Sequence, residues 1–194
     1  MKKALVNMRR FVAVVRKGES VADRLAILAF PMLVVLVVLA LGYALGFRVN
    51  TTPSLPLGLY RLTGKPPQRG DVVVFCLEAE SFIRLSQERG YLGHGECPGG
   101  LLPLGKQVYA LPGDVIGIEG GMISVNGQAL PGSAAKGQDS KGRVLPAPLL
   151  EAGTVPPGKA LALALLRPGS FDGRYFGLVS LEGMQAVRPS MVGE

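Results

Sequence analysis

A serine between two prolines is the first candidate nucleophile in this sequence. Ser54 lies in the stretch "NTTPSLPLGLY", residues 50–60, directly after the most apolar part of the chain. The prolines restrict the backbone on either side of the serine. Such a stretch is either an exit linker behind a membrane segment or a stiff support that presents a nucleophilic hydroxyl.

A serine nucleophile needs a base, and the sequence offers two candidates. The one histidine of the chain, His94, would have to serve any Ser-His-Asp mechanism. A lysine is the other choice. The strand pattern of "KQVYALPGD", residues 106–114, places Lys106 on the same face as the apolar Val108 and Ala110.

The pKa of Lys106 decides whether this lysine could act as a base. A free lysine has a pKa near 10.4, so only about one molecule in 2,500 is neutral at pH 7. Burial among apolar side chains lowers such a pKa by roughly 3 to 5 and would supply enough neutral amine. A lysine that starts a strand and extends its amine into water would keep its ordinary pKa and would supply too little neutral amine to act as a base. Spacing alone leaves both interpretations open.

The stretch "GSFDGRYFG", residues 169–177, contains polar groups that could support such a lysine. Asp172 and Arg174 are two positions apart, which allows a local ion pair that shapes a loop. The Ser170 hydroxyl could hydrogen-bond a nearby amine. Taken alone, the stretch predicts a turn that leads into a strand.

Gly and Pro interrupt the apolar sequence after the membrane segment into short runs, a pattern that is typical of a mainly β domain. Short strands are therefore expected to position these side chains. One helix is expected at residues 78–89, ended by Gly90. Asn126 and Gly127 predict a hairpin with a two-residue turn. The predicted strands are residues 58–63, 71–76, 107–111, 115–119, 122–125, 162–167 and 175–182.

One transmembrane helix is predicted at residues 25–47, which contain no charged residue. The run is too long for a cleaved signal peptide and lacks a small-x-small site. Seven basic and two acidic residues precede it. This positive flank, residues 1–24, is expected to stay in the cytoplasm and to send residues 48–194 across the membrane as a β-rich periplasmic domain.

The net charge of +7 does not indicate nucleic-acid binding, because residues 48–194 carry 14 basic and 12 acidic groups, only +2. An ATP site is not expected either. "GLLPLGKQ", residues 100–107, nearly matches a phosphate-binding loop, but Gln107 replaces the hydroxyl that holds magnesium. Composition and motifs therefore indicate no nucleic-acid partner and no cofactor.

Two stretches rich in glycine, proline or small polar residues are expected to be irregular, residues 93–105 and the solvated excursion 132–142. Cys97 would tether the first. Both Cys76 and Cys97 fall on the translocated side, where disulfides persist. A bridge would close a loop of about 20 residues and contribute roughly 3 kcal/mol. One His and two separated Cys do not give the ligand spacing of a zinc site.

Four of these stretches together resemble the signal peptidase I superfamily, and most closely its conjugative-transfer branch, the TraF-type pilin-processing peptidases. The four motifs stand in the family's order, at residues 50–60, 69–75, 106–114 and 169–179. The resemblance implies a signal peptidase I-like β domain. Ser54 is followed by Leu55 rather than the methionine of housekeeping leader peptidases, and one membrane helix is expected rather than two; both features favour the specialised branch.

The resemblance implies a role for each matching residue. Ser54 matches the family's nucleophile, and Lys106 matches the lysine that takes its proton. Ser170 matches the serine that orients this lysine. Asp172 and Arg174 match a structural pair that holds the site together.

The same resemblance implies an oxyanion hole and a disulfide. The family forms the hole from the backbone N–H of the nucleophile and a hydroxyl two residues earlier, here Thr52. Paired cysteines also resemble the conjugative branch, so a disulfide between Cys76 and Cys97 is predicted near the active site.

The function implied by the resemblance is acyl transfer at the bacterial inner membrane. Water would release the acyl-enzyme, or the substrate's own N-terminal amine would attack it and give a cyclic pilin subunit. The expected partners are a membrane-embedded, pilin-like precursor and other secretion-system components, and neither a metal nor a cofactor is expected. The alternatives are a general leader peptidase and a non-catalytic scaffold of a secretion apparatus.

Overall fold

The computed structural model describes the chain in three stretches, residues 21–51, 54–167 and 169–192. The fold is mainly β, as the sequence predicts, and strands from two sheets make up most of its regular structure beyond the N-terminal helix. The chain divides into two compact units, with the boundary between Phe47 and Arg48.

The first unit contains the apolar run as helix α2, Val21–Ala44. Within it, Ile27–Ala44 is long and apolar enough to cross a membrane. The helix includes Pro31 and ends at Ala44, three residues before the predicted end. Phe47 already belongs to strand β1, Phe47–Asn50.

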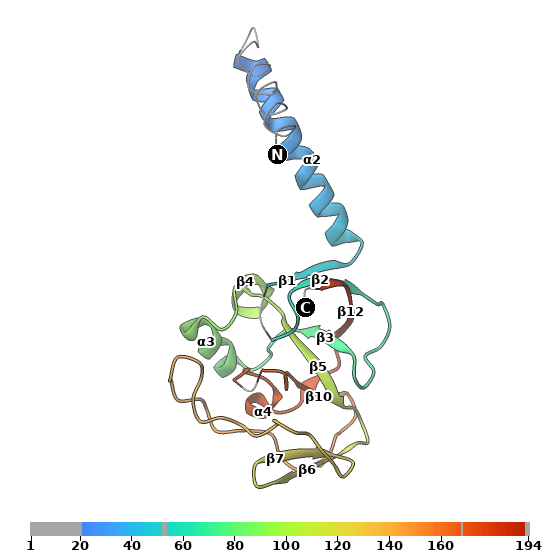
Figure 1. Cartoon of the computed structure of the whole chain (residues 1–194), viewed down its shortest axis with the longest axis vertical. Coiled ribbons are helices and arrows are strands. Elements are labelled where there is room, and N and C mark those ends of the chain that lie inside the picture. The colour runs from blue at the N-terminus through green and yellow to red at the C-terminus, as the bar shows by residue number, and fades with distance from the viewer. Residues whose placement is uncertain (1–20, 52–53, 168, 193–194) are drawn as a thin grey trace, which may run out of the picture. The chain divides into compact units, whose positions relative to one another are not determined.

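A seven-stranded sheet forms the centre of the second unit (Figure 1). Its order is β1, β2 (Gly58–Leu62), β12 (Gln185–Val192), β3 (Val72–Phe75), β5 (Leu104–Ala110), β10 (Lys159–Leu163) and β11 (Val179–Ser180). Strand β5 pairs with β3 on one side and with β10 on the other, both antiparallel. In the first pairing Val73 lies opposite Lys106.

The second sheet has four short strands and packs through its own apolar core. Its order is β8 (Gln128–Ala129), β7 (Met122–Val125), β6 (Val115–Glu119) and β9 (Gly153–Thr154). Val125 pairs with Gln128, so Asn126 and Gly127 form the two-residue turn, both with positive φ. The predicted hairpin is confirmed.

Strand β10 joins the cores of the two sheets. Ala160 and Ala162 pack into the core beside β3 and β5, whereas Leu161 and Leu163 pack against the four-stranded sheet. All four side chains are fully buried. Burial on both faces explains why this strand is a continuous apolar run rather than an alternating one.

The predicted helix is confirmed as α3, Glu80–Arg89, which ends at Gly90 with a left-handed φ of 62°. It buries Phe82 and Ile83 against the larger core. The following stretch, predicted to be irregular, instead contains the short strand β4, His94–Cys97, and the 3-10 turn Pro98–Gly100.

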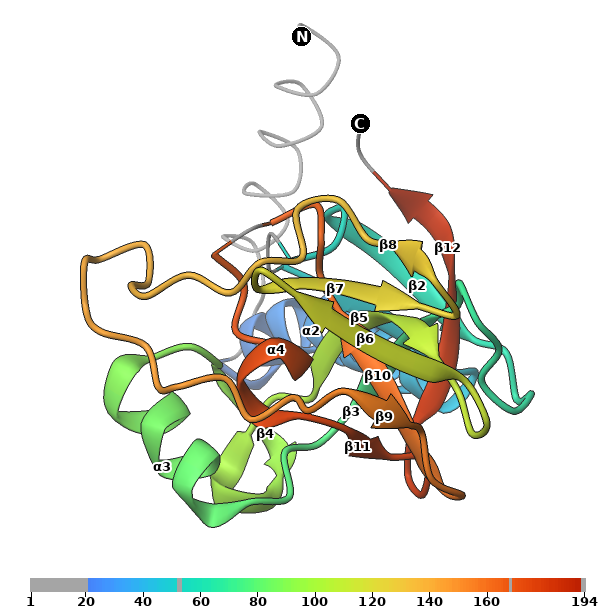
Figure 2. The same cartoon turned by 90° about the horizontal axis from the view of Figure 1, so that it is seen from below.

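Residues 132–142 form a long loop that runs beside α3 (Figure 2). The backbone is irregular, as predicted, but the loop is not simply a solvated excursion. Ser133 is fully buried and its hydroxyl accepts a hydrogen bond from the backbone N–H of Ile123. Tyr175 Oη accepts a bond from the backbone N–H of Lys136 and donates one to the Lys136 carbonyl, which anchors the loop.

Two predicted strand boundaries are wrong near the C-terminus. β10 covers residues 159–163 rather than 162–167, because the backbone N–H of Ala164 donates to the Asp172 carboxylate instead of continuing a ladder. Tyr175 and Phe176, predicted in a strand, belong to the short helix α4, Gly173–Phe176. Asp172 caps this helix by accepting from the backbone N–H of Arg174.

Candidate active site

Lys106 is buried because the alternation of β5 directs it into the protein. Leu104, Lys106, Val108 and Ala110 are all buried along one strand, and the side chains between them are half-buried. Only 3% of Lys106 is exposed. Of the two interpretations that the sequence left open, the structure favours the buried amine over one that extends into water.

Two serine hydroxyls lie within reach of this amine. Lys106 Nζ is 2.7 Å from Ser170 Oγ and 3.4 Å from Ser54 Oγ. A neutral amine has one lone pair and two N–H groups, so it can accept the Ser54 proton while it donates to Ser170. The second hydroxyl thus fixes the direction in which the lone pair points.

Burial lowers the pKa of Lys106 from 10.5 to about 8. The main cause is the loss of hydration of the charged form; the Asp172 carboxylate raises the pKa and the Arg174 guanidinium lowers it, both by smaller amounts. At pH 7 a pKa near 8 leaves about one amine in ten neutral. The site therefore provides a usable base near neutral pH.

Asp172 and Arg174 form a buried, two-pronged ion pair beside the lysine. Arg174 Nε donates to one carboxylate oxygen and its terminal nitrogen donates to the other, each at 2.8 Å. Exposed fractions of 0% and 1% leave these charges dependent on each other. The local ion pair that the two-residue spacing suggested is present.

The same pair shapes the segment that carries Ser170. Arg174 donates to the carbonyl of Ser170 at 3.3 Å, and the carboxylate of Asp172 accepts the backbone N–H of Ala164 at 2.9 Å. The segment between these contacts is thereby held at both ends. Its geometry places the Ser170 hydroxyl on the lysine amine.

Ser54 lies half-buried in a turn before β2. Two side chains fix this turn through its carbonyls: Asn50 Nδ2 donates to Leu55 O and to Pro56 O, at 3.2 and 3.1 Å, and Tyr60 Oη donates to Pro56 O at 2.8 Å. Sequence reasoning assigned no role to Asn50 or Tyr60, although both belong to the quoted motif. The signal available in the sequence was the side-chain amide of Asn50 and the phenol of Tyr60 on either side of Ser54, because both can hydrogen-bond the carbonyls of a turn.

Thr52, which is predicted to contribute its hydroxyl to the oxyanion hole, lies outside the described residues. The other candidate base, His94, is exposed on β4, where it bridges to Leu101. Lys106 is thus the candidate base that the structure places on Ser54.

The predicted disulfide between Cys76 and Cys97 is confirmed, with a Cα–Cα distance of 5.5 Å. It joins the end of β3 to β4. Phe75, next to Cys76, lies opposite Leu104 in the pairing of β3 with β5, two residues before Lys106. The bridge therefore lies one residue away from the pairing at the start of the strand that carries the lysine.

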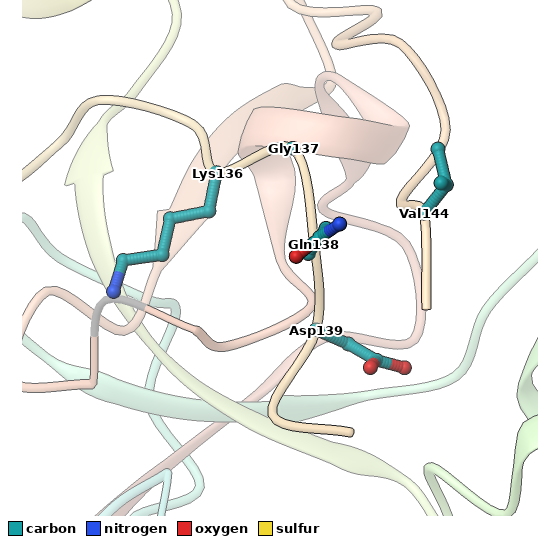
Figure 3. A pocket seen from close by; sticks show the side chains of 5 residues that line it. All are labelled: Lys136, Gly137, Gln138, Asp139 and Val144. Carbon is teal, nitrogen blue, oxygen red and sulfur yellow. The ribbon is translucent and has the colours of Figure 1, made fainter. Parts of the chain in front are cut away.

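A pocket on the long loop is lined by none of the candidate site residues Ser54, Lys106 and Ser170. Its lining consists of Lys136, Gly137, Gln138, Asp139 and Val144 (Figure 3). The side chains of Lys136 and Asp139 extend in opposite directions, and the Asp139 carboxylate already accepts bonds from Tyr91 and Arg143. These contacts tie the loop to Tyr91, two residues beyond the end of α3, and provide the Asp139 carboxylate with hydrogen-bond donors from the protein itself.

Comparison with known proteins identifies relatives over most of the chain. The sequence model described as signal peptidase, peptidase S26, matches residues 22–189. The plasmid transfer protein TraF of Escherichia coli is 38% identical over 146 residues, 75% of this chain and 82% of the relative. The conjugal transfer protein TraF of Agrobacterium fabrum is 40% identical over 146 residues, 74% and 81% of the two chains.

Among solved structures, a signal peptidase I from Enterococcus faecalis matches with 27% sequence identity and a TM-score of 0.37. The match covers 64% of this chain and 97% of the other.

Proposed function

The chain belongs to the signal peptidase family of serine peptidases, peptidase S26, and from this premise we propose that it is a membrane-anchored endopeptidase that cleaves a pilin-like precursor with Ser54 and Lys106. The observation that carries the proposal is the buried lysine amine, 3.4 Å from Ser54 Oγ and 2.7 Å from Ser170 Oγ. A purely structural subunit gains nothing from a buried lysine, because its desolvation destabilises the fold.

In the proposed reaction neutral Lys106 takes the proton of Ser54 as Oγ attacks the carbonyl carbon of the scissile peptide bond. The C–N bond then breaks, and the leaving amine takes the proton from Nζ. An ester remains on Ser54. Water releases it as a carboxylic acid, or the N-terminal amine of the bound fragment attacks it and forms a cyclic amide; in both cases Ser54 recovers its proton.

The cellular setting is proposed from three observations. The relatives in Escherichia coli and Agrobacterium fabrum are named for plasmid or conjugal transfer, which favours a role in conjugation. Helix α2 supplies an anchor that could span the inner membrane, and the basic residues before it favour a cytoplasmic N-terminus. The disulfide between Cys76 and Cys97 fits an oxidising, periplasmic location of the catalytic domain.

Co-expression of the full chain with a candidate pilin precursor tests this function. Intact-mass analysis would compare the wild type with Ser54→Ala and Lys106→Ala, and Lys136→Ala, an exposed lysine of the long loop, serves as the matched control. We expect mature product from the wild type and the control only. A product lighter by one water than the linear form would show cyclisation. Processing by all four proteins would overturn the peptidase assignment and favour the scaffold.

A further inference from the structure

Gly105 directly precedes Lys106 in β5, yet its backbone does not require a glycine. Its φ is not positive, and it pairs with Val74 as an ordinary strand residue. Residues with side chains adopt this conformation readily. The reason for a glycine at this position is therefore the space above its Cα.

Leu55, the neighbour of Ser54, occupies this space. A Cβ added to Gly105 would lie 2.7 Å from Leu55 Cδ1 and 3.7 Å from Leu55 Cγ, whereas ordinary contacts begin at 3.4 Å. Both of these nearest atoms belong to the same side chain. The half-buried Leu55 thus packs directly on the bare Cα of the strand.

This contact joins the segment of the nucleophile to the strand of the base. Ser54 and Leu55 are adjacent in the chain, and so are Gly105 and Lys106. The hydrogen bonds of Asn50 hold the main chain of the turn, while the Leu55 side chain lies against β5 at Gly105. Ser54 Oγ and Lys106 Nζ, each one residue from this contact, are 3.4 Å apart.

We propose that Gly105 is a positioning residue: its missing side chain admits Leu55 and thereby sets the distance between the Ser54 hydroxyl and the Lys106 amine. The inference deepens the proposed function and rests on it. An alanine at 105 would force Leu55 Cδ1 to move by about 0.7 Å, the difference between 2.7 Å and an ordinary contact at 3.4 Å. Misplacement on the order of 1 Å near reacting groups costs up to about 100-fold in rate.

A double-mutant cycle tests the proposal, with Gly105→Ala, Leu55→Ala and the double variant in the full chain. Gly117→Ala is the matched control, because Gly117 is also a half-buried strand glycine without positive φ, and a Cβ there would lie 2.6 Å from Ser124 Oγ. Single-turnover processing of the pilin-like precursor gives the rate, and thermal melting shows whether each variant is folded.

We expect Gly105→Ala to lower kcat about 10- to 100-fold with KM changed less than about twofold. The midpoint of its pH profile should stay at that of the wild type, since Lys106 remains buried. In the Leu55→Ala background the same change should cost less than about threefold, because the conflicting side chain is gone. Gly117→Ala should keep the wild-type rate.

Equal rate losses from Gly105→Ala in both backgrounds, or no loss in either, would overturn the proposal. If Gly105→Ala does not fold, the rate of the double variant is compared with the rate of Leu55→Ala. A double variant that is tenfold slower than Leu55→Ala would contradict the proposal. Acylation of Ser54 by p-nitrophenyl acetate, with Ser54→Ala as the blank, separates the two proposals. A reactive wild type that fails to process the precursor overturns the substrate assignment alone, and the ester reaction then supplies the rates of the cycle. A wild type that neither processes the precursor nor is acylated by the ester overturns both.

Discussion

The rate of precursor processing should rise with pH until about 8 and then become level, because only neutral Lys106 can take the Ser54 proton. Burial lowers the pKa of this lysine from 10.5 to about 8. Below that pKa the neutral fraction, and with it the rate, increases about tenfold per pH unit. At pH 7 about one amine in ten is neutral, against about one in 3,000 without the shift. Burial of Lys106 therefore increases the neutral fraction of this amine at pH 7 about 300-fold.

The same shift makes the fold less stable at neutral pH. The folded chain binds the Lys106 proton less tightly than the unfolded chain, so the unfolded state holds more protons between pH 8 and 10.5. Stability accordingly increases with pH across this window. Below it, burial of the charged amine costs about 3 kcal/mol. Lys106→Met should thus raise the free energy of unfolding at pH 7 by up to about 3 kcal/mol while it abolishes processing.

Two measurements check this reasoning. Single-turnover processing by the detergent-solubilised full chain, followed from about pH 6 to about pH 10, gives the apparent pKa of the base. Urea unfolding of the wild type and Lys106→Met at pH 7 gives the stability difference. A rate that still climbs tenfold per unit above pH 9, a rate independent of pH, or a Lys106→Met variant less stable than the wild type would refute it.

Three further predictions concern the surroundings of the lysine. Ser170→Ala removes the hydroxyl 2.7 Å from the amine and should lower the single-turnover rate about 10- to 100-fold at unchanged KM; an unchanged rate would show that the amine needs no orientation. Arg174→Leu leaves Asp172 as an unpaired buried charge and should cost about 3 to 5 kcal/mol by urea unfolding, whereas a loss below about 1 kcal/mol would contradict the reciprocal role of this ion pair. Replacing Cys76 and Cys97 by serine opens a link between residues 21 positions apart and should cost about 3 kcal/mol; an unchanged melting temperature would count against a stabilising bridge.

The sequence was most informative where a strand alternates. Period two in β5 put Lys106 on the face of Val108 and Ala110, and all three are buried. Because the period is strict, the prediction survives the earlier start of the strand at Leu104. The Asn126-Gly127 hairpin was predictable for a similar reason, since its turn requires positive φ at both positions.

Strand β12 was not predicted, because Pro189 interrupts its sequence. Proline cannot donate a ladder hydrogen bond and normally argues against a strand. Here the register shifts between Pro189 and Met191 in the pairing with β2, so a bulge accommodates the ring. Only the folded sheet shows that this segment pairs with both β2 and β3.

Tertiary contacts also explain the parts of the site that the sequence did not predict. The apolar Tyr175 and Phe176 suggested a strand, but the carboxylate of Asp172 caps a helical turn there instead. The contact between Leu55 and Gly105 joins residues far apart in the chain, and no local pattern indicates it. The order of the motifs predicted that Ser54, Lys106 and Ser170 should meet. The distances between these side chains depend on tertiary packing, which the motifs do not contain.

Detection of an acyl-enzyme tests the central claim most directly. Acid quenching of the full chain during processing, followed by proteolysis and peptide mass analysis, would locate any covalent adduct. The account predicts that the N-terminal fragment of the precursor is esterified to Ser54 in the wild type and that no such adduct forms in Lys106→Ala. Efficient processing with no adduct on Ser54, or processing that continues in Ser54→Ala, would contradict it.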